Sequence, residues 1–175
     1  MSGTHRWKWQ WRVLAWCLPG VMALLAGPEA ALAAEAVWTG TVTHVSDGDT
    51  IWVRPHDGSM PRSVRLDGID APELCQPHGE AARVALVGRV LGQTVQVRVR
   101  ARDDYGRLVA RVSLQRQDVG GWLVSQGHAW SYRYRGRSGP YAARESQARA
   151  RGLGLFGQAH PELPRDFRRR HGSCH

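Results

Sequence analysis

Carboxylates and an arginine are crowded into two short stretches of this 175-residue sequence. The stretch RLDGIDAPE, residues 65–73, contains Asp70 and Glu73 on either side of a proline, and SDGDT, residues 46–50, contains Asp49. Calcium and similar cations prefer oxygen ligands, such as carboxylates that converge with a backbone carbonyl. Asp49 and Asp70 could therefore bind a cation together if the fold brings them side by side. Taken alone, the DGD triplet is better explained as a capped turn with solvated aspartates.

Two arginines accompany these carboxylates. Arg65 precedes Asp70 by five residues, and Pro72 restricts the backbone so that Asp70 and Glu73 are presented at a fixed separation. Arg107 ends the turn DDYGR, residues 103–107, and could approach from another hairpin. A cation and two arginines would neutralise the charge that builds on phosphorus during phosphodiester cleavage, while a free carboxylate orients or deprotonates water.

A simpler explanation exists for each arginine by itself. Arg65 could form a surface salt bridge with Asp67, and Arg107 could pair with Asp103 or Asp104. Each of these pairs is plausible singly. Two arginines and three carboxylates gathered on one face of a barrel would be explained much better by phosphodiester chemistry.

Alternating apolar residues predict the elements that must position these side chains. Residues 94–100, TVQVRVR, alternate cleanly and predict a strand with its valines inward. Three predicted strands, a helix and two more strands indicate a five-stranded Greek-key barrel of the OB type, with two later helices beside it. Such barrels often bind nucleic acid on one face. The predicted strands are residues 37–45, 50–54, 62–68, 94–100 and 108–114, and the predicted helices are residues 77–93, 118–127 and 139–152.

The motifs DGDT, RLDGIDAPE and DDYGR, in this order and at this spacing, resemble those of the thermonuclease family, the staphylococcal nuclease-like domains. The resemblance runs from about Val42 to Phe156. It implies the OB-type barrel with helices, and an exported, Ca²⁺-dependent hydrolase that cleaves phosphodiester bonds of DNA and RNA with little sequence preference. It also implies that the 5′ oxygen leaves and that a 3′-phosphate remains.

The same resemblance implies a role for each matching residue. Three tyrosines are similar to those that contact substrate: Tyr105 would touch a terminal phosphate, and Tyr132 and Tyr134 would line the nucleotide pocket. Trp130 could stack on a base instead, but a tryptophan in this apolar setting is better placed in the core. The implied calcium ligands are Asp49, Asp70 and the carbonyl of Ala71, the implied transition-state arginines are Arg65 and Arg107, and the implied general base or water-positioning carboxylate is Glu73.

Residues 1–33 have the features of a secretory signal peptide. A positive region with Lys8 precedes an apolar run at residues 13–27, and small residues at Ala31 and Ala33 suit cleavage after Ala33 or slightly later. An uncleaved anchor is the alternative, although the run is short for a membrane span. We therefore expect a periplasmic or extracellular protein, monomeric and without stable membrane association after cleavage.

The remaining chain divides into a predicted nuclease domain, residues 37–157, and a basic tail, residues 158–175, that we expect to be flexible. The run Arg168–Arg170 in this tail could contact phosphate, but a solvated tail is the preferred interpretation. Removal of residues 1–33 would leave 21 arginines against 14 acidic residues, a net charge of +7. This balance suggests a phosphate polymer as partner, although solubility or a GC-rich genome could also explain it. Cys75 and Cys174 would then be the two cysteines left, and they could form one disulfide or remain free thiols.

Two other functions compete with the nuclease. An OB barrel can hold nucleic acid without cutting it, although a non-catalytic relative is expected to lack some of the five charged residues that are all present here. Alternatively, the basic face of an envelope protein could bind anionic surface polymers. Both alternatives predict binding without metal-dependent shortening of the nucleic acid.

Overall fold

The computed structural model describes residues 36–174, which lie in one compact unit. The predicted signal peptide, residues 1–33, and its cleavage site lie outside these described residues. Within residues 36–174, no helix combines the length and the apolar character that a membrane span requires.

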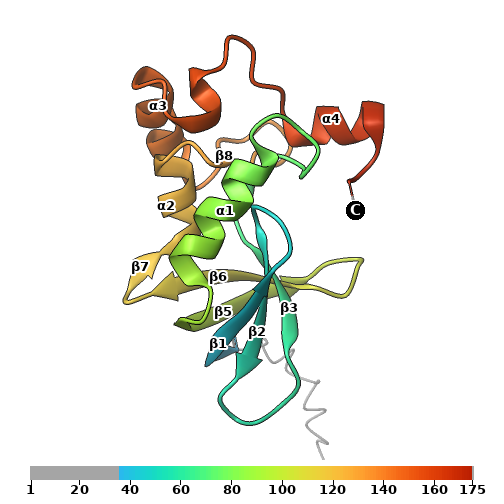
Figure 1. Cartoon of the computed structure of the whole chain (residues 1–175), viewed down its shortest axis with the longest axis vertical. Coiled ribbons are helices and arrows are strands. Elements are labelled where there is room, and N and C mark those ends of the chain that lie inside the picture. Colours follow the sequence, from blue (N-terminus) through green and yellow to red (C-terminus); the bar gives the residue numbers. More distant parts are fainter. Residues whose placement is uncertain (1–35, 175) are drawn as a thin grey trace, which may run out of the picture. The chain divides into compact units, whose positions relative to one another are not determined.

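Five strands close into a barrel (Figure 1). Neighbouring strands are antiparallel in the order β3-β2-β1-β5-β6, and a parallel pairing of β3 with β6 closes the circle. This is the five-stranded OB-type barrel that the sequence predicts. Its strands are β1 (Val37–Val45), β2 (Thr50–Pro55), β3 (Arg62–Leu66), β5 (Thr94–Arg102) and β6 (Leu108–Leu114).

The alternation of the strands fills the barrel with branched apolar side chains. On β5, Val95 and Val97 are buried, whereas Gln96 and Arg98 between and beside them are exposed. Because successive strand residues point to opposite faces, each strand contributes every second side chain to the core. The most deeply buried contributors from the other strands include Val42, Ile51, Val53, Val64, Ala110 and Val112.

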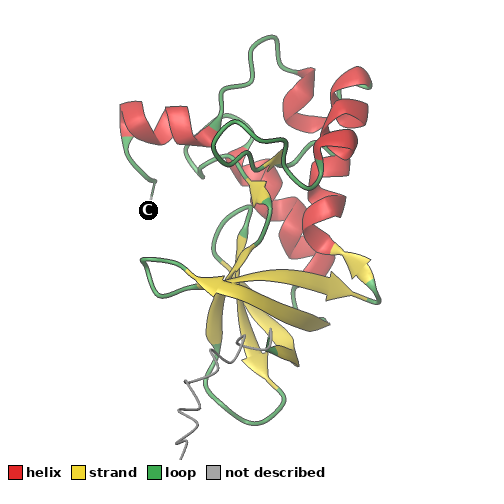
Figure 2. Ribbon diagram, turned by 180° about the vertical axis from the view of Figure 1, so that it is seen from behind, coloured by secondary structure: helices red, strands yellow, loops and turns green. Residues whose placement is uncertain are grey.

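Helices gather beyond one end of the barrel (Figure 2). The sequence predicts about three helices, and the described residues contain four α-helices: α1 (Gly79–Val90), α2 (Val119–Ser125), α3 (Ala142–Ala150) and α4 (Pro164–His171). The carboxylate of Asp118 accepts a hydrogen bond from the Gly121 N–H at 3.1 Å and so caps the N-terminus of α2. A 3₁₀ turn, η1 (Gly154–Gly157), and three two-residue strands, β4 (Ile69–Asp70), β7 (Gln117–Asp118) and β8 (Trp130–Ser131), complete the described part of the chain.

The C-terminal segment differs from the flexible tail that the sequence suggested. It contains α4, whose first helical residue is Pro164 and whose buried Phe167 packs towards the protein. Arginine runs are usually solvated, but here three consecutive arginines lie on a short helix, so only some of them face solvent. Cys174 follows the helix and forms a disulfide with Cys75, which resolves the choice between a bridge and two free thiols in favour of the bridge.

Candidate active site

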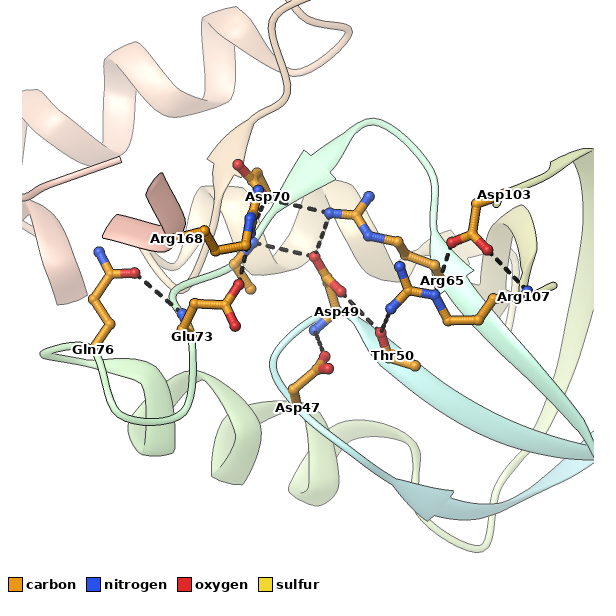
Figure 3. A network of polar contacts seen from close by, with 11 residues as sticks. Asp47, Asp49, Thr50, Arg65, Asp70, Glu73, Gln76, Asp103, Arg107 and Arg168 are labelled. Atoms are coloured by element: carbon orange, nitrogen blue, oxygen red, sulfur yellow. Dashed lines mark hydrogen bonds and ion pairs between the residues drawn. The ribbon is translucent and has the colours of Figure 1, made fainter. Parts of the chain in front are cut away.

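The candidate site forms where four segments meet at one end of the barrel (Figure 3). Asp49 directly precedes β2, and Arg65 lies opposite Thr50 in the antiparallel pairing of β3 with β2. Asp70 ends the short strand β4, which follows β3 after a two-residue turn. Arg107 directly precedes β6, and the parallel pairing of β6 with β3 brings it beside Arg65. The barrel topology therefore brings together side chains that the sequence separates.

A glycine lets the loop before β2 approach the segment after β4. A Cβ atom on Gly48 would lie 2.7 Å from the Cβ of Ala71, a separation that real side chains do not tolerate. With no side chain at this position, Asp49 comes close enough to accept a hydrogen bond from the backbone N–H of Ala71 at 3.4 Å. Asp49, the second aspartate of the DGD triplet, is thus buried in the protein, which rules out the interpretation that the aspartate of this turn is solvated.

Arg65 joins the two buried aspartates. Its Nη2 atom lies 2.9 Å from Oδ2 of Asp49 and 3.3 Å from Oδ1 of Asp70. The carboxylates of Asp49 and Asp70 raise the pKa of Arg65 still further, so the guanidinium is charged. Its partners are these two aspartates rather than Asp67, which lies 3.6 Å from Arg111 instead.

Glu73 lies in the loop between β4 and α1 and contacts Arg168, a residue of the predicted C-terminal tail. Nη1 of Arg168, from α4, lies 2.7 Å from Oε1 of Glu73. The same guanidinium lies 3.4 Å from Oδ1 of Asp70, so Arg65 and Arg168 approach that oxygen from two directions. Charge-assisted pairs of this kind are the stronger class of hydrogen bond.

Arg107 is held beside the aspartates through its own turn. Its Nε donates to Oδ2 of Asp103 at 2.8 Å, which is the ion pair that the simpler explanation proposed. Its Nη1 also donates to the hydroxyl of Thr50 at 3.4 Å, and that hydroxyl donates to Oδ1 of Asp49 at 3.0 Å. The salt bridge therefore does not remove Arg107 from the site but orients its guanidinium towards it.

Burial makes the carboxylates of the site harder to ionise. Burial raises the pKa of Asp70 to about 6, and nearby Asp49 adds to the rise while Arg168 and Arg65 oppose it. Burial, followed by the charge of Asp49, also raises the pKa of Asp47 to about 7. The aspartates crowd negative charge where solvent is largely excluded, a condition that an additional cation would relieve.

A cavity of about 620 Å³ opens over these side chains. Of the three tyrosines expected to contact substrate, Tyr105 and Tyr132 lie in its wall, whereas Tyr134 is exposed and is not among the lining residues. Trp130 is buried and meets Phe156 edge-on, so it belongs to the core, as expected. Four of the five predicted charged site residues also lie in the wall, namely Asp49, Arg65, Glu73 and Arg107. The fifth, Asp70, contacts two of the lining arginines, Arg65 and Arg168.

Two residues of the site were not singled out from the sequence. Asp47 lines the cavity and accepts a hydrogen bond from the backbone N–H of Asp49 at 2.9 Å. Arg168 was assigned to the tail, yet one signal pointed to it. A bridge between Cys75 and Cys174 places residue 168 near residue 73, because Cys75 follows residue 73 by two positions and Cys174 follows residue 168 by six.

No group of three or more His, Cys, Asp or Glu side chains within residues 36–174 is arranged to hold a metal ion. The donor set nevertheless suits a hard cation. Asp49 and Asp70 each place one oxygen within 3.3 Å of the same nitrogen of Arg65, so both carboxylates converge on one positively charged point. Such convergence of carboxylate oxygens is what an oxygen-preferring ion requires.

Comparison with known proteins points to one family. The family model described as "Staphylococcal nuclease homologue" matches residues 63–158, more than half of the chain. Protein ParB of Escherichia coli is 39% identical over 158 residues, covering 84% of this chain and 88% of that protein. A micrococcal nuclease of Shigella flexneri is 36% identical over 149 residues, covering 78% of this chain and 83% of that protein.

Longer plant proteins match as well. "Probable staphylococcal-like nuclease CAN2" of Oryza sativa subsp. japonica is 36% identical over 106 residues, which make up 61% of this chain but 29% of the plant protein. The chain thus spans less than a third of that relative and most of the two bacterial ones.

Proposed function

Because the chain belongs to the staphylococcal nuclease family, which includes relatives named as nucleases, we propose that it is a Ca²⁺-dependent nuclease that cleaves the phosphodiester bonds of DNA and RNA. The observation that carries this proposal is the convergence of two aspartates, two arginines and a glutamate, from four segments of the chain, around one cavity. Hydrolysis of a phosphodiester needs positively charged groups that offset the negative charge of the phosphate, a water or hydroxide nucleophile, and stabilisation of the leaving oxygen.

Asp49 and Asp70 are the side chains that would hold the calcium ion, with the carbonyl of Ala71 as a further oxygen donor. When bound, the ion would supply a positive charge that polarises the phosphoryl oxygen and lowers the pKa of a bound water. Arg65 contacts both aspartates at 2.9 and 3.3 Å, so it lies beside the side chains that would hold the ion, and its guanidinium could bind a phosphate oxygen there.

Arg107, which lies beside Arg65, would also bind the scissile phosphate. Its Nε is fixed by Asp103 at 2.8 Å, which leaves the outer nitrogens of the guanidinium directed at the cavity. Two planar guanidinium groups can share the equatorial oxygens of a phosphoryl group, where negative charge increases in the transition state. Arg65 and Arg107 are therefore proposed as the transition-state arginines.

Glu73 would orient or deprotonate the attacking water. Its side chain lies in the cavity wall, largely shielded from solvent, on the segment that Pro72 stiffens. A carboxylate can accept a proton from the attacking water. It does not bind the phosphate itself, because both groups are negatively charged. We propose that attack on phosphorus expels the 5′ oxygen and leaves a 3′-phosphate.

A second hollow of about 460 Å³ extends the proposed substrate surface. It shares Trp52, Tyr105 and Arg107 with the main cavity and adds Arg62 and Arg102. Exposed aromatic rings next to arginines suit a single-stranded chain, since bases stack on the rings and phosphates pair with the guanidinium groups. Tyr105 and Tyr132 are the proposed contacts nearest the scissile phosphate, and Tyr134 would contact the chain farther out.

We also propose export to the periplasm or beyond. The order of positive, apolar and small residues in residues 1–33 supports it, as does the Cys75–Cys174 disulfide, because disulfides persist in oxidising compartments. In its processed form the protein is proposed to act as a monomer without a membrane anchor.

Incubation of the purified protein with plasmid DNA, and separately with RNA, tests the catalytic proposal. We expect both to be degraded in the presence of Ca²⁺ and to remain intact when a chelator is added. A polynucleotide kinase should label the 5′-hydroxyl ends of the products without prior phosphatase treatment, whereas extension of their 3′ ends by a terminal transferase should require prior removal of the 3′-phosphate. Full-length nucleic acid after prolonged incubation with Ca²⁺, in spite of binding, would refute nuclease activity.

A further inference from the structure

The loop that carries Glu73 is attached to the C-terminal segment at three separate points. We call residues 71–78, between β4 and α1, the Glu73 loop, and residues 162–174 the C-terminal segment. These attachments are an ion pair, a partly buried hydrogen bond and a disulfide, so they are chemically independent of one another. All residues of the C-terminal segment lie beyond residue 158, where the family match ends.

The ion pair acts directly on the carboxylate of Glu73. Arg168 lies 2.7 Å from Oε1 of Glu73, and the described contacts of this carboxylate involve that oxygen alone. The other oxygen, Oε2, is left for water in the cavity. Arg168 itself lies in the cavity wall and its side chain is one-third exposed, so it does not close the cavity over Glu73.

Gln76 connects the backbones of the two segments. Its Oε1 accepts a hydrogen bond from the backbone N–H of Glu73 at 3.2 Å, and its Nε2 donates to the carbonyl of Glu162 at 2.7 Å. The side chain of Gln76 is buried, only 5% of the residue being exposed. A buried amide that makes both bonds fixes its partners, since losing either would leave a polar group unpaired.

The disulfide provides the third attachment. Cys75 lies in the Glu73 loop, two residues after Glu73, and its partner Cys174 lies six residues after Arg168. Glu162, the partner of Gln76, precedes α4 and Cys174 follows it, so the two attachments connect both ends of α4 to the loop.

We infer that Arg168 is a positioning residue, which orients Glu73 for water through Oε1, and that the C-terminal segment fixes the Glu73 loop for this purpose. The inference rests on the proposed role of Glu73. An inhibitory latch would require the arginine to block the carboxylate or the cavity. Contact with one oxygen and an open cavity favour positioning instead.

Steady-state cleavage of DNA by Arg168→Ala, Arg168→Lys and Arg169→Ala tests this inference. Arg169 is the matched control: it lies on the same helix, its side chain is 76% exposed and it pairs with Asp166 rather than with the site. We expect Arg168→Ala to lower kcat about 10- to 100-fold with less than about a threefold change in KM, as misplacement of a reacting group would. Arg168→Lys should recover part of kcat, because its ammonium can still reach one carboxylate oxygen.

A double-mutant cycle with Glu73→Gln separates positioning from direct contact with substrate. If Arg168 acts through Glu73, Arg168→Ala should reduce the residual rate of Glu73→Gln by less than about twofold. A full additional loss in the Glu73→Gln background would show that Arg168 acts independently of Glu73, through Asp70 or through the phosphate itself. Increased activity of Arg168→Ala would show a latch. Either result overturns the inference.

Hydrogen exchange decides about the attachment without any activity measurement. We expect the backbone amides of residues 73–76 and 78 to exchange at least about tenfold faster in Arg168→Ala and in Cys174→Ser than in Arg169→Ala. In Arg168→Ala the protection of β1 and β5 should be unchanged, whereas loss of the disulfide in Cys174→Ser should lower protection there as well. Equal protection of these amides in all variants would overturn the role of the C-terminal segment. If the parent protein cleaves no nucleic acid, the proposed function fails, whereas the exchange measurement still tests the attachment.

Discussion

At the scale of single residues, the site depends on arginines that satisfy carboxylates and remain available to a ligand. Arg107 illustrates this dual role: Asp103 fixes its Nε, and the rest of the guanidinium faces Thr50 and the cavity. An arginine held in this way does not have to be ordered again when substrate binds. Preorganised donors of this kind stabilise developing charge more effectively than mobile ones.

Replacement of Arg107 by alanine should therefore affect rate far more than stability. We expect Arg107→Ala to lower kcat/KM at least about 100-fold, because one donor to the transition state is lost. Its ion pair with Asp103 is partly exposed, so the free energy of unfolding should change by less than about 1 kcal/mol. Cleavage kinetics and urea unfolding measure the two effects. Arg83→Ala, which removes an exposed pair with Glu80 on α1, is the control, and parental activity of Arg107→Ala would exclude the proposed role.

At the scale of elements, the sequence predicts what local periodicity determines. The barrel strands alternate over five or more residues, so their limits agree closely with expectation, and β1 and β6 match it exactly. Strands β4 and β8 have two residues each and are defined only by their pairing with one another, so no local pattern could predict them. Helix α4 follows an arginine-rich pattern that favours a solvated tail, and only contacts distant in sequence fix it.

The same limits apply to the candidate site. Asp49, Arg65, Asp70, Glu73 and Arg107 could be assigned because their motifs occur in a characteristic order, and the structure brings them together. The contact between Arg168 and Glu73 spans 95 residues, and no motif encodes it. Tyr134 is the opposite case, because it was assigned to the site by resemblance but does not lie in the cavity wall.

Close packing at the start of α1 yields a prediction for two glycines of the same helix. A Cβ on Gly79 would lie 1.8 Å from the carbonyl oxygen of Glu73, whereas a Cβ on Gly88 would meet no atom within 4 Å. Gly79→Ala must displace the Glu73 loop and should destabilise the protein by about 2 kcal/mol or more. Gly88→Ala should stabilise it by about 0.5–1 kcal/mol, because alanine favours a helix interior. Urea unfolding compares the variants, and equal stability of both would contradict the packing described here.

Two histidines that join α1 to the loop after α2 should make stability depend on pH. Nε2 of His78 and Nδ1 of His128 lie 3.1 Å apart, and burial lowers the pKa of both side chains. A folded-state pKa below the unfolded value of about 6.5 means that the unfolded chain takes up protons first. The associated stability is therefore complete above about pH 6.5 and decreases as the pH falls below it.

Asparagine is the suitable replacement for His78, because it tolerates the φ of 73° found there. Unfolding of His78→Asn between pH 8 and pH 5 should show a weaker loss of stability in acid than unfolding of the parent protein. Parallel pH profiles for the two proteins would exclude the histidine pair as the source.

At the scale of the whole molecule, a single covalent bond joins the end of the described chain to the barrel's site. The Cys75–Cys174 disulfide closes a loop with a sequence separation of 99 residues, which includes all four described α-helices and two barrel strands. A long closed loop restricts the unfolded chain strongly, so such a bridge stabilises the folded state in the chain-entropy description. The domain boundary expected at residue 157 therefore separates segments that share one site.

Removal of this disulfide should destabilise the entire domain. We expect the Cys75→Ser/Cys174→Ser variant to lose about 2–5 kcal/mol of unfolding free energy, measured with guanidinium chloride. Thiol titration of the denatured parent protein without residues 1–33 provides the control and should detect no free thiol. Two titratable thiols, or unchanged stability of the serine variant, would contradict the bridge.

The central proposal is that the residues lining one cavity, among them Glu73, hydrolyse the phosphodiester. Single-turnover cleavage of end-labelled single-stranded DNA in Ca²⁺, by the parent protein and by Glu73→Gln, tests it most directly when binding is measured in parallel. We expect similar affinities and at least about a 100-fold slower cleavage by Glu73→Gln, since the proposed role of the carboxylate is to act on water and not on DNA. Cleavage by Glu73→Gln at the parental rate would contradict it.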